Sequence, residues 1–256
     1  MQFAIETLLS GWRQTHETKR HTSRPMAKAI IFDIDGTLLD SVDLHAQAWQ
    51  DAFQHFGHDI LFDKIRSQIG KGGDQLLPVF LSDAELKQRG KEIEKYRGDL
   101  FKRKYLDQVK PFPRVRDLFL KVKGEGQQVA LASSAKPDEL KKFEEIAHID
   151  DLVEIETSSG DAKRSKPHPD IFEAALKRLD DLERENVVVV GDSPHDAEGA
   201  KRAGLRTVGV RCGGFPEEEL RKAGCIGIYD GPEDLLKRYE ETPLAPNYAS
   251  SRSAAR

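Results

Sequence analysis

The chain has 256 residues, of which 38% are hydrophobic and 33% are charged, and its formal net charge is -4. This composition indicates a globular protein with a charged surface, and the small negative charge argues against binding to nucleic acid or to an anionic membrane. No apolar stretch reaches the roughly 18 residues that a membrane helix needs, and the first residues lack the layout of a signal peptide. The two cysteines, Cys212 and Cys225, have neither disulfide-framework nor metal-ligand spacing. We therefore expect a reduced, cytoplasmic compartment.

The two ends of the chain differ in composition from the rest. Residues 1–26 are polar, rich in His, Thr and Arg, and run up to a second methionine, Met26. We expect them to be a disordered extension, or to result from a start assigned too far upstream. Residues 242–256 are rich in Pro, Ala, Ser and Arg, and we expect a disordered tail there.

Between these ends, short apolar runs alternate with helical patterns. The runs at 28–32, 128–132, 187–190 and 207–210 are continuous and mostly β-branched, which is typical of parallel strands buried on both faces. Helical patterns follow at 113–123, 137–147, 169–179 and 194–203. The alternation predicts an α/β fold with a doubly wound, Rossmann-like parallel sheet, built from residues 27–40 and 108–241.

Residues 41–107 break this alternation, because they contain helical patterns and no predicted strand. An apolar stripe with spacings of three and four begins this stretch, formed by Val42, Ala46, Trp49, Phe53 and Phe56. A capping box at 82–85 then opens a long helix with Leu86, Ile93 and Leu100 at intervals of seven. We therefore expect an all-helical cap domain inserted just after the first strand.

Acidic and polar side chains follow the predicted strands directly. They are Asp33 and Asp35 after the first strand, Ser133 and Ser134 after the second, and Asp192 and Asp196 after the third. Ligands bind beyond the carboxyl ends of the strands in open parallel sheets, so these groups are expected to converge. Lys166 lies in the loop before a helix, and geometry alone does not bring it there.

Clustered carboxylates raise one another's pKa, and a bound cation relieves the repulsion. Mg2+ prefers a few carboxylates together with waters and substrate phosphate. Ser133 and Lys166 can hold phosphate oxygens, and a carboxylate beside the metal can act as a nucleophile that forms an aspartyl phosphate. Each feature alone has an ordinary structural explanation, such as a surface turn or a helix N-cap, but all of them in this order favour phosphoryl-transfer chemistry.

These residues resemble the four motifs of the haloacid dehalogenase superfamily. The motifs are DIDGT at 33–37, Ser133, Lys166 and GDSPHD at 191–196, and the resemblance covers residues 28–238. It is strongest to the branch with a helical cap after the first motif, which includes phosphoglycolate phosphatase and β-phosphoglucomutase. The resemblance thus implies the α/β core and the cap domain expected above.

The resemblance also implies catalytic roles. Asp33 would be the nucleophile, and Asp35 would be the general acid/base that protonates the leaving alcohol and then activates water. Ser133 and Lys166 would bind the phosphoryl group, with Ser134 beside them.

A Mg2+ ion would be the cofactor. Its implied ligands are Asp33, Asp192 and the backbone carbonyl of Asp35, with Asp196 as a further ligand or as an orienting neighbour. The backbone N–H groups of Gly36 and Thr37 would donate to phosphate oxygens.

The expected function is a phosphatase that hydrolyses small phosphomonoesters. A β-phosphoglucomutase-like activity is the alternative, because His45 and Trp49 lie one turn apart on the first cap helix as a similar pair does in that enzyme. Glu precedes the fourth-motif Asp in the mutase, however, whereas Gly191 occupies that place here, as is more common in phosphatases. A non-catalytic binding module is a third reading, disfavoured because every expected chemical position is occupied.

The cap is expected to supply specificity. His45 would contact the substrate or gate Asp35, and the alternative is a helix histidine that packs on Trp49. Lys71, in the glycine-rich stretch 70–73, would reach an anionic group of the substrate, and the alternative is a plain turn between helices. The cap would close about hinges near 40–41 and 107–110. The expected partner is a small phosphorylated metabolite, phosphoglycolate or sugar-phosphate in type, bound by a monomer.

Overall fold

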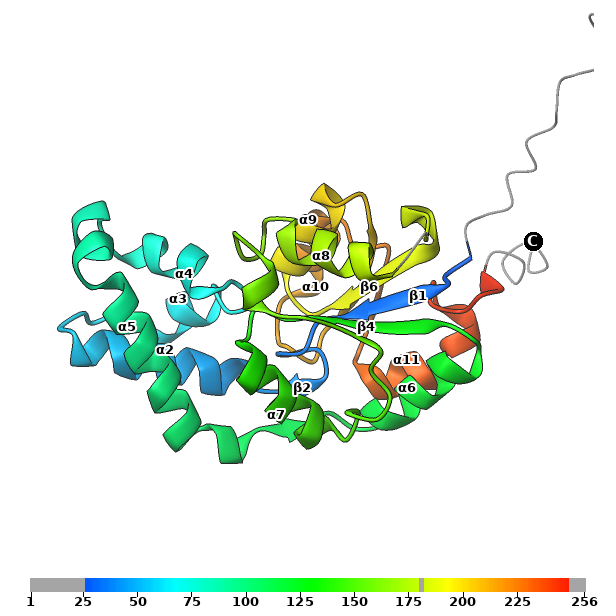
Figure 1. Cartoon of the computed structure of the whole chain (residues 1–256), viewed down its shortest axis with the longest axis horizontal. Coiled ribbons are helices and arrows are strands. Elements are labelled where there is room, and N and C mark those ends of the chain that lie inside the picture. The colour runs from blue at the N-terminus through cyan, green and yellow to red at the C-terminus, as the bar shows by residue number, and fades with distance from the viewer. Residues whose placement is uncertain (1–25, 180–181, 249–256) are drawn as a thin grey trace, which may run out of the picture.

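The protein is described here by a computed structural model of residues 26–179 and 182–248 (Figure 1). Six parallel strands form its central sheet in the order β5-β4-β1-β6-β7-β8. Their bounds are β1 Ala29–Phe32, β4 Gln128–Ala132, β5 Ile155–Thr157, β6 Val187–Gly191, β7 Arg206–Val210 and β8 Gly227–Tyr229. The predicted α/β fold with a parallel sheet is therefore confirmed.

Helices cover both faces of the sheet because side chains alternate along each strand. On β1, Ile30 and Phe32 pack against α6 (Val115–Gly124), α7 (Pro137–Ala147) and α11 (Pro232–Lys237). Ala29 and Ile31 point to the other face, toward α8 (Asp170–Arg178) and α9 (Pro194–Arg202), with α10 (Glu217–Ala223) packed beside α9. Figure 1 shows α6 and α11 on one side of the sheet and α8 and α9 on the other. The continuous apolar strands thus supply two hydrophobic cores.

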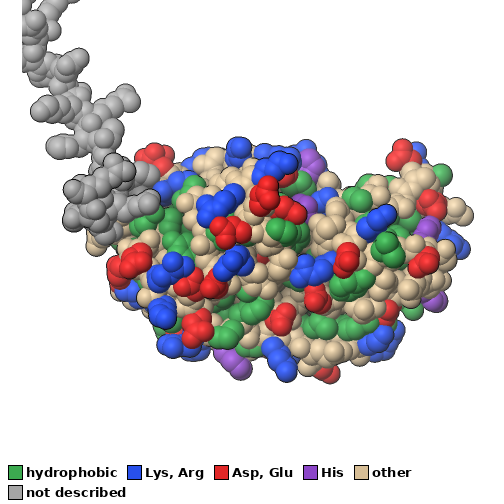
Figure 2. Space-filling view, turned by 180° about the vertical axis from the view of Figure 1, so that it is seen from behind, with side chains coloured by type: hydrophobic (Ala, Val, Ile, Leu, Met, Phe, Trp, Pro, Cys, Tyr) green, Lys and Arg blue, Asp and Glu red, His purple; other side chains and the backbone are tan. Residues whose placement is uncertain are grey.

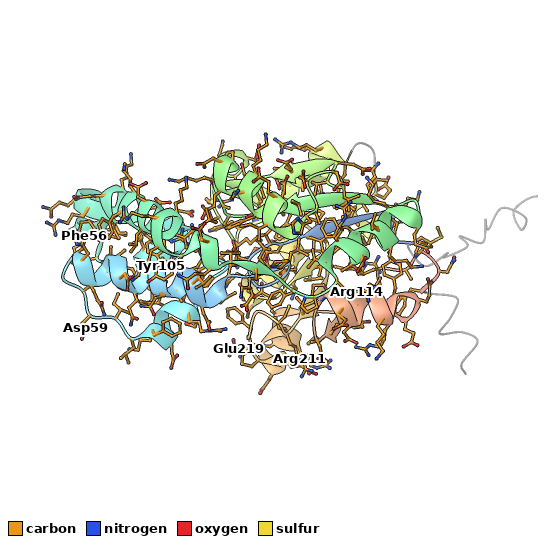
Figure 3. All side chains as sticks on the ribbon, turned by 90° about the horizontal axis from the view of Figure 1, so that it is seen from below. Phe56, Asp59, Tyr105, Arg114, Arg211 and Glu219 are labelled. Atoms are coloured by element: carbon orange, nitrogen blue, oxygen red, sulfur yellow. The ribbon has the colours of Figure 1, made fainter. Side chains whose placement is uncertain are left out.

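The segment between β1 and β4 forms a helical module, defined here as residues 42–104 (Figure 1). Its helices are α2 Val42–His55, α3 Phe62–Arg66, α4 Gly73–Phe80 and α5 Asp83–Lys104. Buried side chains from these helices form a third hydrophobic cluster, which includes Val42, Trp49, Phe53 and Ile93. In Figure 3, Phe56 and Asp59 lie at the end of the module that is farthest from the sheet.

The long helix of the module begins as its sequence predicts. The Ser82 side chain accepts a hydrogen bond from the Glu85 N–H, and the Glu85 carboxylate accepts one from the Ser82 N–H at 2.9 Å. This capping box satisfies N–H groups that the first turn of a helix leaves without partners.

Two short strands join the module to the sheet. β2 (Leu39–Asp40) pairs antiparallel with β3 (Lys110–Pro111), so the chain enters and leaves the module side by side. The pair lies at the two expected hinge positions, and hinge motion about it stays a prediction.

Several parts of the fold were not expected from the sequence. Strands β5 and β8 have three residues each and lie at the sheet edges, too short for an apolar run to stand out. Single 3-10 turns also occur, at Leu106–Gln108, Ser159–Asp161, Arg184–Asn186 and Tyr239–Glu241. Among the described residues, no helix has the length and apolar character needed to cross a membrane.

The expected boundary of the C-terminal tail is wrong for its first residues. Thr242, Leu244 and Ala245 are buried, and the Leu244 carbonyl accepts a hydrogen bond from the buried Gln127 amide at 2.7 Å. Residues 242–245 are therefore buried, and Tyr248 packs against the core. The rest of the expected tail, 249–256, and the expected extension at 1–25 lie outside the described residues.

Candidate active site

Three buried carboxylates meet at the carboxyl ends of β1 and β6. Asp33 follows β1 directly, Asp192 follows β6, and Asp196 lies in the first turn of α9. One oxygen from each lies within 4.8 Å of the others, and all three residues are at most 5% exposed. The convergence expected from the strand ends is therefore present.

A helix cap fixes the position of Asp196. Its Oδ2 accepts hydrogen bonds from the Ser193 N–H at 3.2 Å and from the Ser193 hydroxyl at 2.6 Å. The Ser193 hydroxyl in turn accepts one from the Asp196 N–H. This arrangement is a capping box, and it leaves Asp196 Oδ1 directed at the neighbouring cation.

Lys166 is that cation, and it is 1% exposed. Its Nζ donates to Asp33 Oδ1 and to the Ala132 carbonyl at 2.8 Å, and it lies 2.8 Å from Asp196 Oδ1. Burial disfavours its charge, but the charges of Asp196 and Asp33 outweigh burial and raise the pKa of Lys166. The structure thus places Lys166 among the carboxylates, which the sequence alone did not decide.

A single lysine does not balance three carboxylates. Burial and the charge of Asp196 raise the pKa of Asp33 to about 7, against the lowering effect of Lys166. Burial and the charges of Asp196 and Asp33 raise the pKa of Asp192 well above its usual range. A second cation would relieve this repulsion.

The donor set fits a magnesium ion. Carboxylate oxygens are the hard ligands that Mg2+ prefers, and a few of them suffice, with water and phosphate completing the shell. Asp33, Asp192 and Asp196 are the residues that would hold the ion. The Asp35 carboxylate is turned away from this group, and the expected contribution of the Asp35 carbonyl stays a prediction.

The carboxylate of Asp35 is held by the helical module. Its Oδ1 accepts a hydrogen bond from the Ser41 hydroxyl at 2.5 Å and lies 2.8 Å from His45 Nε2. Burial disfavours its charge, but the interactions with His45 and Ser41 outweigh burial, so the pKa of Asp35 lies below its usual value. This carboxylate is therefore ionised and positioned by α2.

Arg97 on α5 determines which nitrogen of His45 carries the proton. Arg97 Nη2 lies 2.5 Å from His45 Nδ1, and a guanidinium can only donate. His45 Nδ1 is then the acceptor, so the proton lies on Nε2 and is donated to Asp35. The His45 ring also stacks on Phe101, with centroids 4.0 Å apart, which fixes its orientation.

The turn after Asp33 needs glycine at position 36. Gly36 has φ +82°, and a Cβ there would lie 2.3 Å from Asp192 Oδ2. The Thr37 hydroxyl lies 3.1 Å from Asp33 Oδ2 and 3.2 Å from Asp192 Oδ1, so it links the two strand ends. The turn is what allows the two carboxylates to approach.

The expected phosphate binding by this turn conflicts with its hydrogen bonds. The Gly36 N–H donates to the Leu39 carbonyl at 2.8 Å, and the Thr37 N–H donates to the Ile34 carbonyl at 3.1 Å. Both donors are used within the turn because it is tightly wound, and neither is free for a phosphate oxygen.

Ser133 and Ser134 differ in position. Ser133 is fully buried, and its Oγ accepts a hydrogen bond from the Ala135 N–H at 3.1 Å, which leaves its hydroxyl proton available for donation. Ser134 lines the cavity described next. The roles expected for both in phosphate binding stay predictions.

A cavity of about 360 Å³ opens above the carboxylates, between the sheet and the helical module. Asp33 and Asp35 lie on its sheet side, and His45, Lys71 and Arg97 on its module side. Lys71 is partly buried, its Nζ donates to Gln68 at 2.6 Å, and burial lowers its pKa. The expected site residues His45 and Lys71 thus face the same space as the expected nucleophile.

Polar contacts join the helical module to the sheet domain. They are Arg66 Nη2 to the Gly213 carbonyl (3.0 Å), Ser165 N–H to Asp74 Oδ2 (3.1 Å), His195 Nε2 to the Ser67 carbonyl (3.3 Å) and Lys102 Nζ to Asp138 Oδ2 (2.5 Å). In this conformation the module is therefore closed over the carboxylates.

The sequence analysis missed most charged residues of the cavity wall, among them Arg97 and Glu139. Each of these two had a weak signal, because each is a charged residue on the apolar side of its helix. Arg97 lies between Ile93 and Leu100 on the stripe of α5, and Glu139 lies next to Leu140 on α7.

Comparison with known proteins agrees with this geometry. Residues 30–210 match the family model described as haloacid dehalogenase-like hydrolase. A phosphorylated carbohydrates phosphatase of Thermotoga maritima is 28% identical over 215 residues, which are 84% of this chain and 99% of that protein. A phosphoglycolate phosphatase of Aquifex aeolicus is 29% identical over 187 residues, 70% of this chain and 83% of that protein. The crystal structure of a hydrolase from Pseudomonas syringae matches with a TM-score of 0.77 at 27% identity, over 84% of this chain and 98% of that one.

Proposed function

The chain belongs to the haloacid dehalogenase-like hydrolase family and is a phosphoric monoester hydrolase, and we propose that it hydrolyses small phosphomonoesters with Mg2+ through an aspartyl phosphate on Asp33. The observation that carries the proposal is the environment of Asp33. Its carboxylate faces the cavity, and Lys166, Asp192 and Asp196 lie close to it. A nucleophile, a cation for the transferred group and a metal-ligand set thus share one sheet edge.

In the first step an Asp33 oxygen attacks phosphorus, and the bond from phosphorus to the alcohol oxygen breaks. When a substrate phosphate lies beside Asp35, its negative charge favours the protonated carboxyl over the ionised one, so Asp35 takes up a proton from solvent on substrate binding and gives it to the leaving alcohol. In the second step water attacks phosphorus, Asp35 takes a proton from that water, and the bond from phosphorus to Asp33 breaks. Inorganic phosphate leaves, and both aspartates return to their starting state.

The residues around the reaction have separate tasks. Lys166 neutralises charge on the phosphoryl oxygens, which is the main requirement in phosphoryl transfer. His45 holds Asp35, the acid/base residue, on the alcohol side of Asp33. The ion, when bound by Asp33, Asp192 and Asp196, supplies further positive charge to the phosphate oxygens.

Position 191 favours the phosphatase over the mutase alternative. A Cβ at Gly191 would lie 2.6 Å from the Cβ of Asp196, so the glutamate found before the fourth-motif Asp in β-phosphoglucomutase does not fit this backbone. We retain the mutase as the activity to be tested against.

The remaining expectations about partners also stand as proposals: a small phosphorylated metabolite as substrate, a monomer, a cytoplasmic location, and neither nucleic acid nor membrane as partner. The surface supports the last of these. On the face shown in Figure 2, lysine and arginine side chains are interspersed with aspartates and glutamates, whereas nucleic-acid binding uses a field of positive charge.

Phosphate release from a panel of small phosphomonoesters, with and without Mg2+, tests the proposal. We expect release that depends on Mg2+ and vanishes in Asp33→Ala. Asp117→Ala is the matched control, because Asp117 lies on α6 outside the cavity, is half-exposed and pairs with Arg114. Isomerisation of sugar phosphates without net phosphate release would instead establish the mutase.

A further inference from the structure

The cavity wall contains a carboxylate that the proposed reaction does not use. Glu139 lies near the start of α7, lines the cavity and is 6% exposed. Its Oε1 is buried and, across residues 26–179 and 182–248, has no hydrogen-bond partner. A buried polar group without a partner costs free energy, so native proteins rarely keep one without a purpose.

Arg97 lies on the module side of the cavity, and one of its N–H donors has no acceptor among the described residues. Its Nη2 is engaged with His45, but its buried Nε donates to no acceptor within the described part of the chain. Among the acidic groups that act on this guanidinium, Glu139 has the largest effect, ahead of Asp35 and Glu94. The two side chains therefore face each other through space without forming a direct ion pair.

Glu139 thus offers a hydrogen-bond acceptor on the sheet side of the cavity, and Arg97 offers a donor on the module side. A hydroxyl group is the small group that satisfies both, because it donates one hydrogen bond and accepts others. A carboxylate or phosphate can only accept, and it would meet the negative charge of Glu139. The geometry is thus complementary to an alcohol hydroxyl and not to a second anion.

We propose that Glu139 and Arg97 form a hydroxyl-binding subsite for the leaving alcohol, so that the substrates are phosphate esters of polyhydroxylated alcohols, sugar or polyol phosphates, rather than carboxylate-bearing esters such as phosphoglycolate. The inference rests on the proposed function. Glu139 accepts a hydrogen bond from a substrate hydroxyl, which also accepts one from Arg97.

Of the four lysines that line the cavity (Lys71, Lys102, Lys136 and Lys163), the two on the module side are already engaged. Lys102 Nζ pairs with Asp138 at 2.5 Å, and Lys71 Nζ donates to Gln68 at 2.6 Å. Glu94 adds a further carboxylate to the wall beside Arg97. A second anionic group that bound Lys71 or Lys102 would have to displace these contacts.

The volume of the cavity agrees with such a ligand. At about 360 Å³, it lies near the lower end of small-molecule sites, which span about 300–1,000 Å³. A five- or six-carbon polyol fills it better than the two-carbon glycolate.

The test compares kcat/KM for D-sorbitol 6-phosphate, D-glucose 6-phosphate and 2-phosphoglycolate, each with Mg2+. In the wild type we expect the better of the two hydroxylated esters to exceed 2-phosphoglycolate by about tenfold or more, one charged hydrogen bond being worth roughly that factor. In Glu139→Gln this ratio should fall by about tenfold, because the amide no longer offers a charged acceptor and no longer repels a carboxylate.

Glu145→Gln is the matched control. Glu145 lies on the same helix but is exposed and pairs with Lys142, so this variant should keep the wild-type ratio. Thermal unfolding of Glu139→Gln should occur at or above the wild-type temperature, since a buried carboxylate without a partner has been removed.

The outcomes separate this inference from the proposed function. Hydrolysis of all three esters with a ratio that Glu139→Gln leaves unchanged overturns the subsite and leaves the phosphatase intact. A wild type that prefers 2-phosphoglycolate overturns it as well. Absence of Mg2+-dependent hydrolysis of every ester overturns the proposed function, and the subsite with it.

Discussion

The sheet edge and the helical module contribute opposite kinds of residue to the same cavity. At the sheet edge, Asp33 and Asp196 are bound to Lys166, and Thr37 links Asp33 to Asp192, all of them buried. The module contributes partly buried side chains that have few partners or face outward to the cavity, such as Lys71 and Arg97.

The difference shows how one fold assigns the reaction to the sheet edge and the choice of substrate to the helical module. The charges of the sheet edge are pre-organised by two hydrophobic cores and by strand ends that cannot move independently, which suits transition-state stabilisation. The module has a hydrophobic cluster of its own and joins the sheet through the two short strands β2 and β3. Apart from His45, which holds Asp35, its residues can therefore vary, or move, without disturbing the carboxylates.

The largest effect is expected where the sheet edge loses its cation. Lys166→Met removes the only lysine within reach of Asp33 among the described residues, and we expect kcat/KM to fall by about 10²–10³-fold, as for other groups that stabilise transition-state charge. Steady-state phosphate release measures the change. Lys177→Met, at an exposed position on α8, should retain wild-type rates, and a loss of less than fivefold in Lys166→Met would contradict the role given to this cation.

A smaller effect is expected where the module reaches into the chemistry. His45→Ala removes the hydrogen bond to Asp35, and we expect kcat to fall by about 10–100-fold with little change in KM, because a positioned acid/base is worth about 10²–10⁴ in total. His55→Ala is a close control: His55 lies on the same helix and also stacks on an aromatic ring, that of Tyr96 at 4.2 Å. Full turnover in His45→Ala would show that the module does not act on Asp35.

A third prediction concerns stability in the sheet domain. Burial and the neighbouring Glu156 raise the pKa of Glu144 from 4.5 to about 7. Because the folded protein binds this proton more tightly than the unfolded chain, the group lowers the free energy of unfolding as pH rises from about 4.5 to about 7, and the loss is complete above that range. Glu144→Gln should therefore be more stable than wild type at pH 8, by about 1 kcal/mol after allowance for solvent screening.

Urea unfolding at pH 8 and at about pH 3.5 measures this difference, which should disappear at the lower pH, where Glu144 is protonated in both states. Glu145→Gln, at the exposed neighbouring position, should show no gain at pH 8. An equal gain at both pH values would mean that the effect comes from packing and not from charge.

The smallest expected effect tests whether the module is a separate stability unit. Ser82→Ala removes the capping box of α5, which should cost about 1 kcal/mol. Hydrogen exchange should show faster opening of the α5 amides, with the sheet strands unchanged. Ser67→Ala is the control, since Ser67 is an exposed residue of the module outside any capping box. Equal acceleration in the strands of the sheet would show that module and sheet unfold together.

Much of the site was predictable because it follows from chain order. The apolar runs that end at Phe32 and Val190 predict buried parallel strands, and parallel strands bring their carboxyl ends to one edge. Asp33 and Asp192 had to meet once these strands were recognised. The helical module was predictable for a similar reason, since its apolar spacing and its capping box are local signals.

Only the tertiary structure decided which side chains face one another across elements. Arg97 and His45 are separated by 52 positions, and Lys166 and Asp33 by 133. Neither pair leaves a periodic trace in the sequence, because a side chain's identity carries no information about the element that will pack opposite it. The same holds for Glu139, because only the tertiary structure shows that it lines the cavity. It also holds for residues 242–248, because their polar and proline-rich composition does not indicate that Leu244 binds Gln127.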